Sequence, residues 1–307
     1  MIRHLNSLLE LSPEDVQWIF DRTRRLKQAH QAGQRPALLA GRVLTQIFEK
    51  PSLRTRLSFD AAMMQLGGQS IFLTARDAGL NGREAVADVA RVIGSYCDVI
   101  AMRTFSQQLI DDFIRYAGVP VINGLSDQRH PCQALTDVFT LQEIFGELAG
   151  RRLVFVGDGN NVASSLAAAC ALSGVLFRLC CPPGYEIPAE VRQELQRRFP
   201  QASVEVTHDL AEAVKDADVI YTDVWTSMGQ ETEEATRRRV FQPYQIHAHV
   251  MARAPATARF MHCLPARRGQ EVTDEILDGP QSVVFQQAEN RMHVAKGILC
   301  WVLHVEP

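Results

Sequence analysis

Long apolar runs are absent from this 307-residue sequence, and so is a strong excess of charge of either sign. No uninterrupted apolar stretch approaches the roughly 20 residues that a membrane-spanning helix needs. The first residues, MIRHLNSLLELSPEDV, lack the apolar core of a signal peptide. The formal net charge is −3, so there is no broad basic field for nucleic acid or for an anionic membrane. We therefore expect neither nucleic-acid nor membrane partners.

Cysteine is not arranged as it is in disulfide-rich or zinc-binding proteins. The sequence has 7 cysteines, an odd number, without a CxxC pair, and Cys180 and Cys181 are adjacent. Such usage is typical of reduced thiols, and we expect a cytoplasmic protein. His247 and His249 could chelate a metal, but no acidic or cysteine partner lies at ligand spacing, so we expect no metal site.

What the sequence does contain is an alternation of short apolar runs with segments of helical spacing. Hydrophobic residues make up 46% and charged residues 22%, as in globular proteins, and the length favours two domains. Repeated strand–helix alternation predicts parallel sheets with crossover helices on both faces. The predicted strands are 42–48, 70–73, 97–102, 119–123, 152–157, 175–180, 203–206, 218–224, 258–264 and 282–285.

The alternation occurs in two halves, so we expect an α/β protein of two doubly wound parallel-sheet domains, each a three-layer αβα arrangement. The stretch LQEIFGELAGR at 141–151 is the predicted bridge between them. A last helix, at 288–304, could pack on either half. Ligands of open α/β sheets bind beyond the carboxyl ends of the strands, and we expect the active site in the cleft between the domains.

The stretch FEKPSLRTRLSFD, residues 48–60, concentrates hydrogen-bond donors where a strand passes into a helix. Ser52 stands at the N-cap position, and Arg54 and Thr55 fall in the first turn. Because the N-terminus of a helix is the positive end of its dipole, a cation there costs stability unless an anion occupies the site. We interpret the stretch as a phosphate or carboxylate site. The alternative is a capped helix with solvated arginines. A Walker loop is excluded because GxxxxGK[ST] is missing.

Polar residues also follow other predicted strands. Arg103 follows CDVIAM, HPCQ at 130–133 follows VPVIN, and HCLP at 262–265 follows ARFM. Because the carboxyl ends of parallel strands meet at one edge of a sheet, these groups are expected to converge. A single histidine is more often a structural residue, but three strand-end motifs in one chain favour a functional site.

Taken together, these motifs resemble those of the carbamoyltransferases, and specifically those of the ornithine carbamoyltransferase family. The resemblance runs almost from end to end, and the order and spacing of the motifs make it specific. The motifs are FEKPSLRTR at 48–56, MRTF at 102–105, HPCQALTD at 130–137, VGDGNNV at 156–162, DVWTSMGQE at 223–231, HCLPA at 262–266 and ENRMH at 289–293.

The resemblance implies a carbamoyl-phosphate domain over residues 1–145, completed by the C-terminal helix 288–307, and an ornithine domain over 146–287. It implies transfer of the carbamoyl group of carbamoyl phosphate to the δ-amine of L-ornithine, which gives L-citrulline and phosphate in arginine metabolism. It also implies a homotrimer, or a multiple of trimers, with active sites at subunit interfaces. No cofactor is implied.

Site residues follow from the same resemblance, position by position. Those implied for carbamoyl phosphate are Ser52, the backbone N–H of Leu53, Arg54, Thr55, Arg103, His130, Gln133, Cys263, the backbone carbonyl of Leu264, and Arg291. Those implied for ornithine are Asn161, Asp223, Ser227 and Met228. The catalytic set is Arg103, His130, Cys263 and Asp223. The first two would polarise the carbamoyl oxygen, and Cys263 would handle the amine proton or fix its lone pair.

The sequence departs from the family pattern in one loop. Relatives bring a polar side chain, often glutamine, from this loop into the neighbouring subunit's site, whereas RDAGLNGREAVAD has Gly79 at that place. Asn81 and Arg83 are the candidates that could replace it. Leu53 also stands where many relatives have threonine, a change without consequence if this position contributes its backbone N–H.

Other functions stay open at this point. In VGDGNNV, Gly157 and Gly159 match the first glycines of a dinucleotide-binding fingerprint, but Val162 stands where the third is needed. A dinucleotide-binding oxidoreductase is therefore the alternative from another class. A carbamoyltransferase for N-acetylornithine or putrescine, and a non-catalytic relative, are the alternatives within the family.

Overall fold

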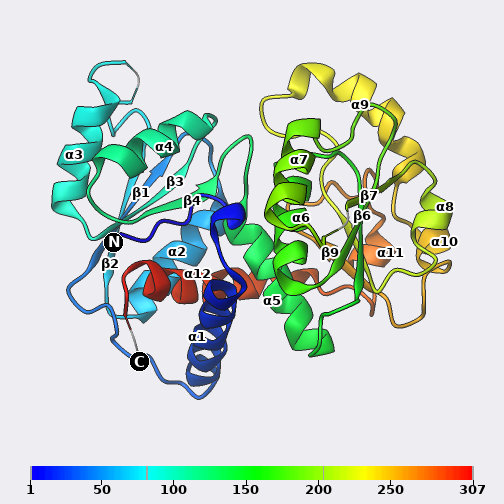
Figure 1. The fold of residues 1–307 in the computed structure, drawn as a ribbon, viewed down its shortest axis with the longest axis horizontal. Helices are drawn as coiled ribbons and strands as arrows, with labels where there is room; N and C mark the ends of the chain where they lie inside the picture. The colour runs from blue at the N-terminus through cyan, green and yellow to red at the C-terminus, as the bar shows by residue number, and fades with distance from the viewer. Residues whose placement is uncertain (1, 81, 203, 306–307) are drawn as a thin grey trace. The chain divides into compact units, whose positions relative to one another are not determined.

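A computed structural model describes residues 2–80, 82–202 and 204–305. The chain divides into two compact units, which we call unit 1 (Met1–Phe139 with Glu289–Pro307) and unit 2 (Thr140–Ala288) (Figure 1). Each unit contains its own parallel β-sheet. None of the helices in the described part of the chain combines the length and the apolar composition that crossing a bilayer requires.

Unit 1 is built on a four-stranded sheet in the order β2-β1-β3-β4, in which every neighbouring pair is parallel. Its strands are β1 (Val43–Phe48), β2 (Gln69–Thr74), β3 (Val99–Arg103) and β4 (Val121–Leu125). The helices that belong to it wholly or in part are α1 (Pro13–Gln31), α2 (Leu53–Gln65), α3 (Val86–Tyr96), α4 (Gln107–Tyr116), α5 (Pro131–Phe145) and α12 (Val284–Val302). The division between the units falls inside α5 and α12.

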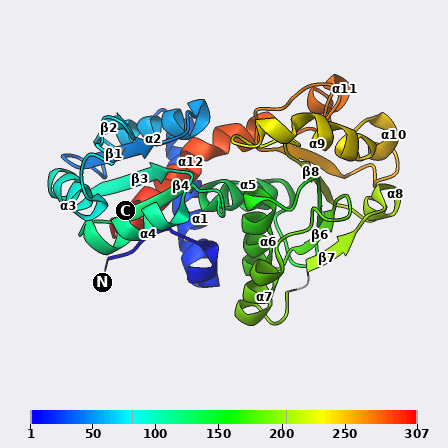
Figure 2. The same ribbon diagram turned by 90° about the horizontal axis from the view of Figure 1, so that it is seen from above.

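Alternation along the strands of unit 1 places helices on both faces of the sheet (Figure 2). Ile47 of β1 packs in an apolar cluster with residues of α3 and α4. The preceding residue, Gln46, points to the other face and donates to Asp60 of α2 at 2.6 Å. On that face α12 lies against α2, as the contact between Gln65 and Met292 shows.

Unit 2 is built on a five-stranded parallel sheet in the order β7-β6-β5-β8-β9. Its strands are β5 (Arg152–Val156), β6 (Leu176–Cys180), β7 (Val204–Thr207), β8 (Val219–Thr222) and β9 (Arg259–His262). Its helices are α6 (Asn161–Ser173), α7 (Ala189–Arg198), α8 (Leu210–Ala213), α9 (Glu234–Phe241), α10 (Ala248–Met251) and α11 (Asp274–Leu277). The predicted architecture of two parallel-sheet α/β domains is confirmed.

One predicted strand is wrong. Residues 282–285 do not form a strand, because α12 begins at Val284. Ser282 makes only an isolated bridge to Phe260 of β9, and the N–H of Val283 donates to the carbonyl of Phe260 at 3.0 Å. The apolar run SVVF therefore makes one bridge beside the sheet and then begins a helix, in which Val284 is buried and Phe285 is 64% exposed. The other predicted strands are present with small changes at their ends.

The seven cysteines are all free thiols, as their spacing predicts.

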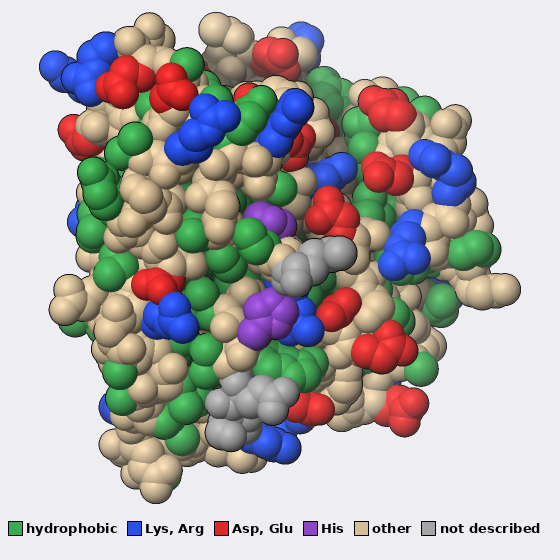
Figure 3. All heavy atoms as spheres, turned by 60° about the vertical axis from the view of Figure 1, so that its left-hand side comes forward, with side chains coloured by type: hydrophobic (Ala, Val, Ile, Leu, Met, Phe, Trp, Pro, Cys, Tyr) green, Lys and Arg blue, Asp and Glu red, His purple; other side chains and the backbone are tan. Residues whose placement is uncertain are grey.

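At the surface, hydrophobic side chains lie among charged and polar ones on the side of the molecule seen in Figure 3.

Candidate functional site

The β1–α2 junction of unit 1 forms a helix start with a serine cap and no acidic residue. Ser52 is extended, and its Oγ accepts from the backbone N–H of Thr55 at 3.3 Å. It also lies 3.0 Å from the Thr55 hydroxyl. The side chain of Leu53 is 69% exposed, so Leu53 contributes to this helix start through its backbone. The first turn therefore offers N–H groups, hydroxyls and the half-buried Arg54 to an anion.

Strand register brings further predicted residues to the same edge of unit 1. Phe48, at the end of β1, is the register partner of Arg103, at the end of β3, and Arg103 is in turn the partner of Leu125 in β4. Gly124 lies close to the start of α2, because a Cβ added there would stand 3.4 Å from Cγ2 of Thr55. The carboxyl ends of these strands and the N-terminus of α2 thus meet at one place.

Arg291 of α12 connects three of these segments. Its guanidinium donates to the hydroxyl of Thr55 at 3.2 Å and, in a short hydrogen bond, to the side-chain carbonyl of Gln133. The amide nitrogen of Gln133 donates to Asp137 at 2.7 Å, which fixes the orientation of that side chain. The sequence separates Arg291 from Thr55 by 236 residues, and the fold places them in direct contact.

His130 is buried immediately before α5. Burial lowers its pKa well below the usual value of 6.5, and the positive charges of Arg291 and Arg103 lower it further. The imidazole is consequently neutral at physiological pH and can act as a hydrogen-bond donor without carrying charge. Arg103, His130, Gln133 and Arg291 are therefore neighbours in unit 1, as the strand-end motifs predict.

Lys50 is a residue of this edge that the sequence analysis missed. It is buried, forms a short ion pair with Asp127, and lies 4.2 Å from the centre of the Phe105 ring. The neighbouring Glu49 accepts from the N–H of Phe105 at 2.7 Å. Together these contacts attach the β1–α2 loop to the segments after β3 and β4. The signal was a lysine inside the FEKPS run, to which no partner could be assigned without the fold.

In unit 2 the predicted residues Asp223 and Cys263 are in contact. They follow β8 and β9, which are adjacent strands, and the thiol of Cys263 donates to Oδ1 of Asp223 at 3.1 Å. The other oxygen, Oδ2, accepts from the amide of Asn160 at 3.2 Å. Asn160 also caps α6, since its side chain accepts from the N–H groups of Val162 and Ala163. Asn160 was not among the predicted residues, whereas its neighbour Asn161 was.

Asn161 begins α6, directly after the cap. Ser227 and Met228 lie in the loop after β8, where the N–H of Ser227 donates to the side chain of Gln230 at 3.2 Å. Met228 is 45% exposed. Asp223 stands at the start of this same loop, where its Oδ1 also accepts from the N–H of Val224 at 2.8 Å.

The HCLP segment is held by a buried histidine. His262 donates from Nε2 to Glu271 at 3.1 Å, and its Nδ1 accepts from the N–H of Leu264 at 2.9 Å. Leu264 has φ +57°, a conformation that costs energy in a residue with a side chain and that clusters at functional sites. Asp223, His262 and Cys263 each have a potential metal-ligand atom within 4.8 Å of the others. Both ring nitrogens of His262 are already hydrogen-bonded, which disfavours a metal here.

Of the two glycines in VGDGNNV, Gly159 is required by local packing. A Cβ added to Gly159 would lie 2.3 Å from the backbone nitrogen of Ile187, so only glycine fits. The N–H of Gly159 also donates to the carbonyl of Tyr185 at 2.8 Å. The close approach of the 185–187 backbone thus explains why glycine stands at position 159, without reference to a nucleotide.

Two of the three residues singled out in the Gly79 loop, Gly79 and Arg83, are among the described residues. Gly79 has φ +74°, which glycine adopts readily. Arg83 is exposed and pairs with Glu84 at 2.7 Å. Asn81, the other candidate for this loop, lies outside the described residues.

Comparison with known proteins gives the same family for both halves of the chain. The model of the aspartate/ornithine carbamoyltransferase carbamoyl-P binding domain matches residues 3–143, and that of the Asp/Orn binding domain matches residues 149–302. The ornithine carbamoyltransferase of Methanopyrus kandleri is 48% identical over 303 residues, which are 98% of this chain and 97% of that protein. That of Bacillus subtilis is 47% identical over 98% of this chain and 94% of its own length.

Solved structures agree with the sequence comparison. The ornithine carbamoyltransferase from Pyrococcus furiosus superposes with a TM-score of 0.95 at 45% identity, covering 99% of this chain and 98% of that one. The enzyme from Thermus thermophilus has a TM-score of 0.88 at 40% identity, with 98% of both chains covered. Because both halves match in the order in which the motifs occur, this chain belongs to the aspartate/ornithine carbamoyltransferase family.

Proposed function

We propose that this protein transfers the carbamoyl group of carbamoyl phosphate to the δ-amine of L-ornithine, giving L-citrulline and phosphate. The observation that carries the proposal is the helix start of unit 1. There Arg54, the cap Ser52 and the hydroxyl of Thr55 stand in a first turn without an acidic residue, and Arg291 connects Thr55 to Gln133. Relatives that carry the name ornithine carbamoyltransferase cover the whole chain and support this choice of reaction.

In the proposal, residues 1–145 with the C-terminal helix 288–307 bind carbamoyl phosphate. The phosphate takes the N–H groups of the first turn of α2, with Ser52, Arg54 and Thr55 around it. Gln133, oriented by Arg291 and Asp137, holds the amide end of the carbamoyl group. An anion in this place would offset the cost of having Arg54 at the positive end of the helix dipole.

Arg103 and His130 polarise the carbamoyl oxygen in this scheme. Negative charge develops on that oxygen as the amine attacks, and donors placed at such an oxygen contribute about 3–4 kcal/mol each. The lowered pKa of His130 suits the role, because a neutral imidazole donates a hydrogen bond without adding a third positive charge to those of Arg103 and Arg291. The leaving phosphate stays on the helix N-terminus and Arg54.

Residues 146–287 bind the amino acid in the proposal. Asp223 accepts the α-amino group, while Asn161, Ser227 and Met228 surround the α-carbon end. A free δ-amine has a pKa like that of lysine, about 10.4, so deprotonating it at pH 7 costs roughly 4–5 kcal/mol. Cys263, with the backbone carbonyl of Leu264, stands beside the amine, and its contact with Asp223 gives a route for the amine proton. The amine is the nucleophile, and no acyl-cysteine forms.

We also propose a cytoplasmic homotrimer or a multiple of trimers. Free thiols throughout the chain suit a reducing compartment. Leu57 and Met64 are exposed apolar residues of α2 that lie two turns apart on the same face of the helix. Ile71 is exposed on the edge strand β2. Such side chains on an open sheet edge favour a protein partner. Light scattering coupled to size exclusion would measure the mass, and a monomer at assay concentration would contradict this proposal.

The test of the proposed function is a comparison of acceptors. Product formation from carbamoyl phosphate is measured with ornithine, N-acetylornithine, putrescine and aspartate at matched concentrations. Ornithine should exceed each of the others by at least about 100-fold in kcat/KM. N-acetylornithine and putrescine leave site groups built for the α-amino and α-carboxylate groups unpaired, and aspartate has no side-chain amine to act as the nucleophile. Equal or faster turnover of another acceptor would overturn the assignment of ornithine.

A further inference from the structure

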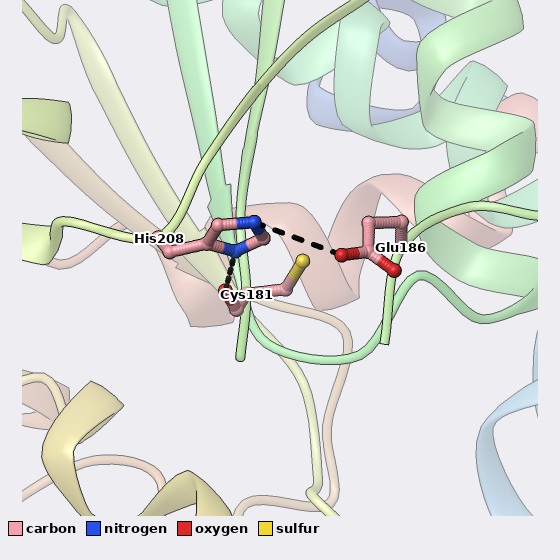
Figure 4. A group of neighbouring side chains, drawn as sticks. All are labelled: Cys181, Glu186 and His208. Atoms are coloured by element: carbon pink, nitrogen blue, oxygen red, sulfur yellow. Dashed lines mark hydrogen bonds and ion pairs between the residues drawn. The ribbon is translucent and has the colours of Figure 1, made fainter. Parts of the chain in front are cut away.

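Three potential metal ligands of unit 2, none of them assigned to carbamoyl transfer, lie together (Figure 4). Cys181 comes directly after β6 and His208 directly after β7, and these strands are neighbours in the sheet. Glu186 belongs to the loop that follows β6. One thiol, one imidazole nitrogen and one carboxylate oxygen lie within 4.8 Å of one another. None of the three takes part in the proposed reaction.

The hydrogen bonds of His208 fix which ring nitrogen faces the other two side chains. Its Nδ1 is 2.7 Å from the backbone carbonyl of Cys181, an oxygen that can only accept, so Nδ1 carries the proton. In the neutral ring Nε2 is then the atom with a lone pair, and it lies 3.7 Å from Oε1 of Glu186 (Figure 4). A lone pair and a carboxylate that face each other are favourable partners for a cation, either a proton on Nε2 or a metal ion.

The arrangement has the features of a zinc site. A histidine ligand typically donates its second ring N–H to a backbone carbonyl, as His208 does to Cys181. Zinc bound at about 2.0–2.3 Å in a tetrahedron needs ligand atoms about 3.4–3.7 Å apart. The His208–Glu186 separation already has this value, and the flexible glutamate and cysteine side chains need to move inward by only about 1 Å. A thiolate, an imidazole and a carboxylate together favour zinc over magnesium or calcium.

We propose that Cys181, Glu186 and His208 bind a zinc ion, with water as the fourth ligand. The thiol proton passes to solvent as the zinc–sulfur bond forms, with no change of oxidation state. The ion would join the ends of β6 and β7 to the 182–187 loop. That loop packs on Gly159, just before α6, with the N–H of Gly159 donating to Tyr185 at 2.8 Å. The site therefore stabilises the loop against which α6 starts.

Cobalt substitution tests which cysteine binds the metal. Co²⁺ is added to the chelator-treated full-length protein, and the thiolate-to-cobalt charge-transfer band in the near ultraviolet is recorded. Cys181→Ser should abolish the band. Cys180→Ser is the matched control, since Cys180 is the adjacent thiol but belongs to the apolar core on one face of the sheet. Cys263→Ser should also keep the band. Loss of the band in Cys263→Ser with retention in Cys181→Ser would overturn the proposal.

Substitution of Glu186 and His208, the two partly exposed ligands, gives a second test, in which the buried Cys181 is unchanged. Glu186→Gln and His208→Gln should each weaken zinc binding by at least about 100-fold in competition with a coloured chelator. Zinc at about 100 times its Kd should raise the melting temperature of the unaltered protein by about 4 °C and leave both variants unchanged. If zinc does not bind the unaltered protein, or binds both variants equally well, His208 and Glu186 form an ordinary ion pair and the proposal is wrong.

Discussion

Helices α1 and α2 begin with the same cap and with opposite charge. Ser12 and Ser52 are both extended, and each accepts from the N–H three residues later, at 3.2 Å from Asp15 and 3.3 Å from Thr55. In α1 the first turn contains Glu14 and Asp15, and Asp15 completes a capping box by accepting from the N–H of Ser12. In α2 the first turn contains no acid.

The difference shows what each helix start is for. At α1 the acidic side chains complement the helix dipole and satisfy its N–H groups, so this terminus is complete by itself. At α2 Arg54 stands against the dipole, and cations from β3 and α12 are added nearby. An anion from outside would complement these positive groups, as the acidic side chains complement the start of α1. We infer that α1 has a structural start and α2 a ligand-binding one.

The largest expected effect comes from removing the cation of α2. Arg54→Ala should lower kcat/KM for carbamoyl phosphate by about 1,000-fold, because a charged donor to the phosphate is lost at the reacting ligand. The matched control is Arg56→Ala, two residues along. Arg56 is exposed, stacks 3.8 Å above the Phe72 ring and pairs with Asp60. Steady-state kinetics should show less than about a threefold change for Arg56→Ala. Equal effects of the two changes would break the comparison.

Making α2 resemble α1 should change stability and binding in opposite directions. Leu53→Glu places an acid in the first turn at an exposed position, as Glu14 does in α1. The free energy of unfolding should rise by about 0.3–1 kcal/mol, and the affinity for inorganic phosphate should fall about 10-fold. Leu53→Gln is the uncharged control. Urea unfolding and calorimetric titration measure the two quantities, and tighter phosphate binding by Leu53→Glu would contradict the account.

The titration of His130 should report its burial and, after that, the positive charges of Arg291 and Arg103 beside the start of α2. Its native pKa lies well below the unfolded value of about 6.5, so the unfolded state takes up the proton first. Stability from this group is complete above pH 6.5 and is lost as the pH falls below it. A bound phosphate should raise the pKa of His130 again and reduce that loss. NMR of the ring protons, with and without phosphate, measures both effects. Titration near pH 6.5 in the free protein would be incompatible with the site described here.

The smallest expected effect separates the two caps. Ser12→Ala and Ser52→Ala should each cost about 1 kcal/mol of unfolding free energy, because each removes one N-cap hydrogen bond. Only Ser52→Ala should also weaken phosphate binding. If Ser12→Ala lowers phosphate affinity as much, the caps do not differ in the way proposed.

Sequence patterns were sufficient for most of the fold, because buried parallel strands are short apolar runs that alternate with helices. They failed at 282–285, where the apolar run belongs to the start of α12. A few residues of β-branched and aromatic type do not distinguish a strand from the start of a helix. The bounds of the two domains and their cleft stay predictions.

The candidate site was predictable where chemistry and strand ends coincide, as for Ser52, Arg54, Arg103 and His130. Pairwise contacts were not predictable. Lys50 and Asp127 are 77 residues apart, and their ion pair depends on the packing of two loops. Asn160 and Asn161 are adjacent asparagines, so the sequence alone does not distinguish their roles. The geometry of α6 shows that Asn160 both caps the helix and donates to Asp223.

The most direct test of the central claim is a crystal structure with a phosphonate-bearing mimic of carbamoyl phosphate joined to ornithine. The account predicts phosphonate oxygens about 2.9 Å from the backbone N–H groups of the first turn of α2 and in contact with Arg54. A phosphonate bound elsewhere, with the first turn of α2 left to solvent, would contradict it.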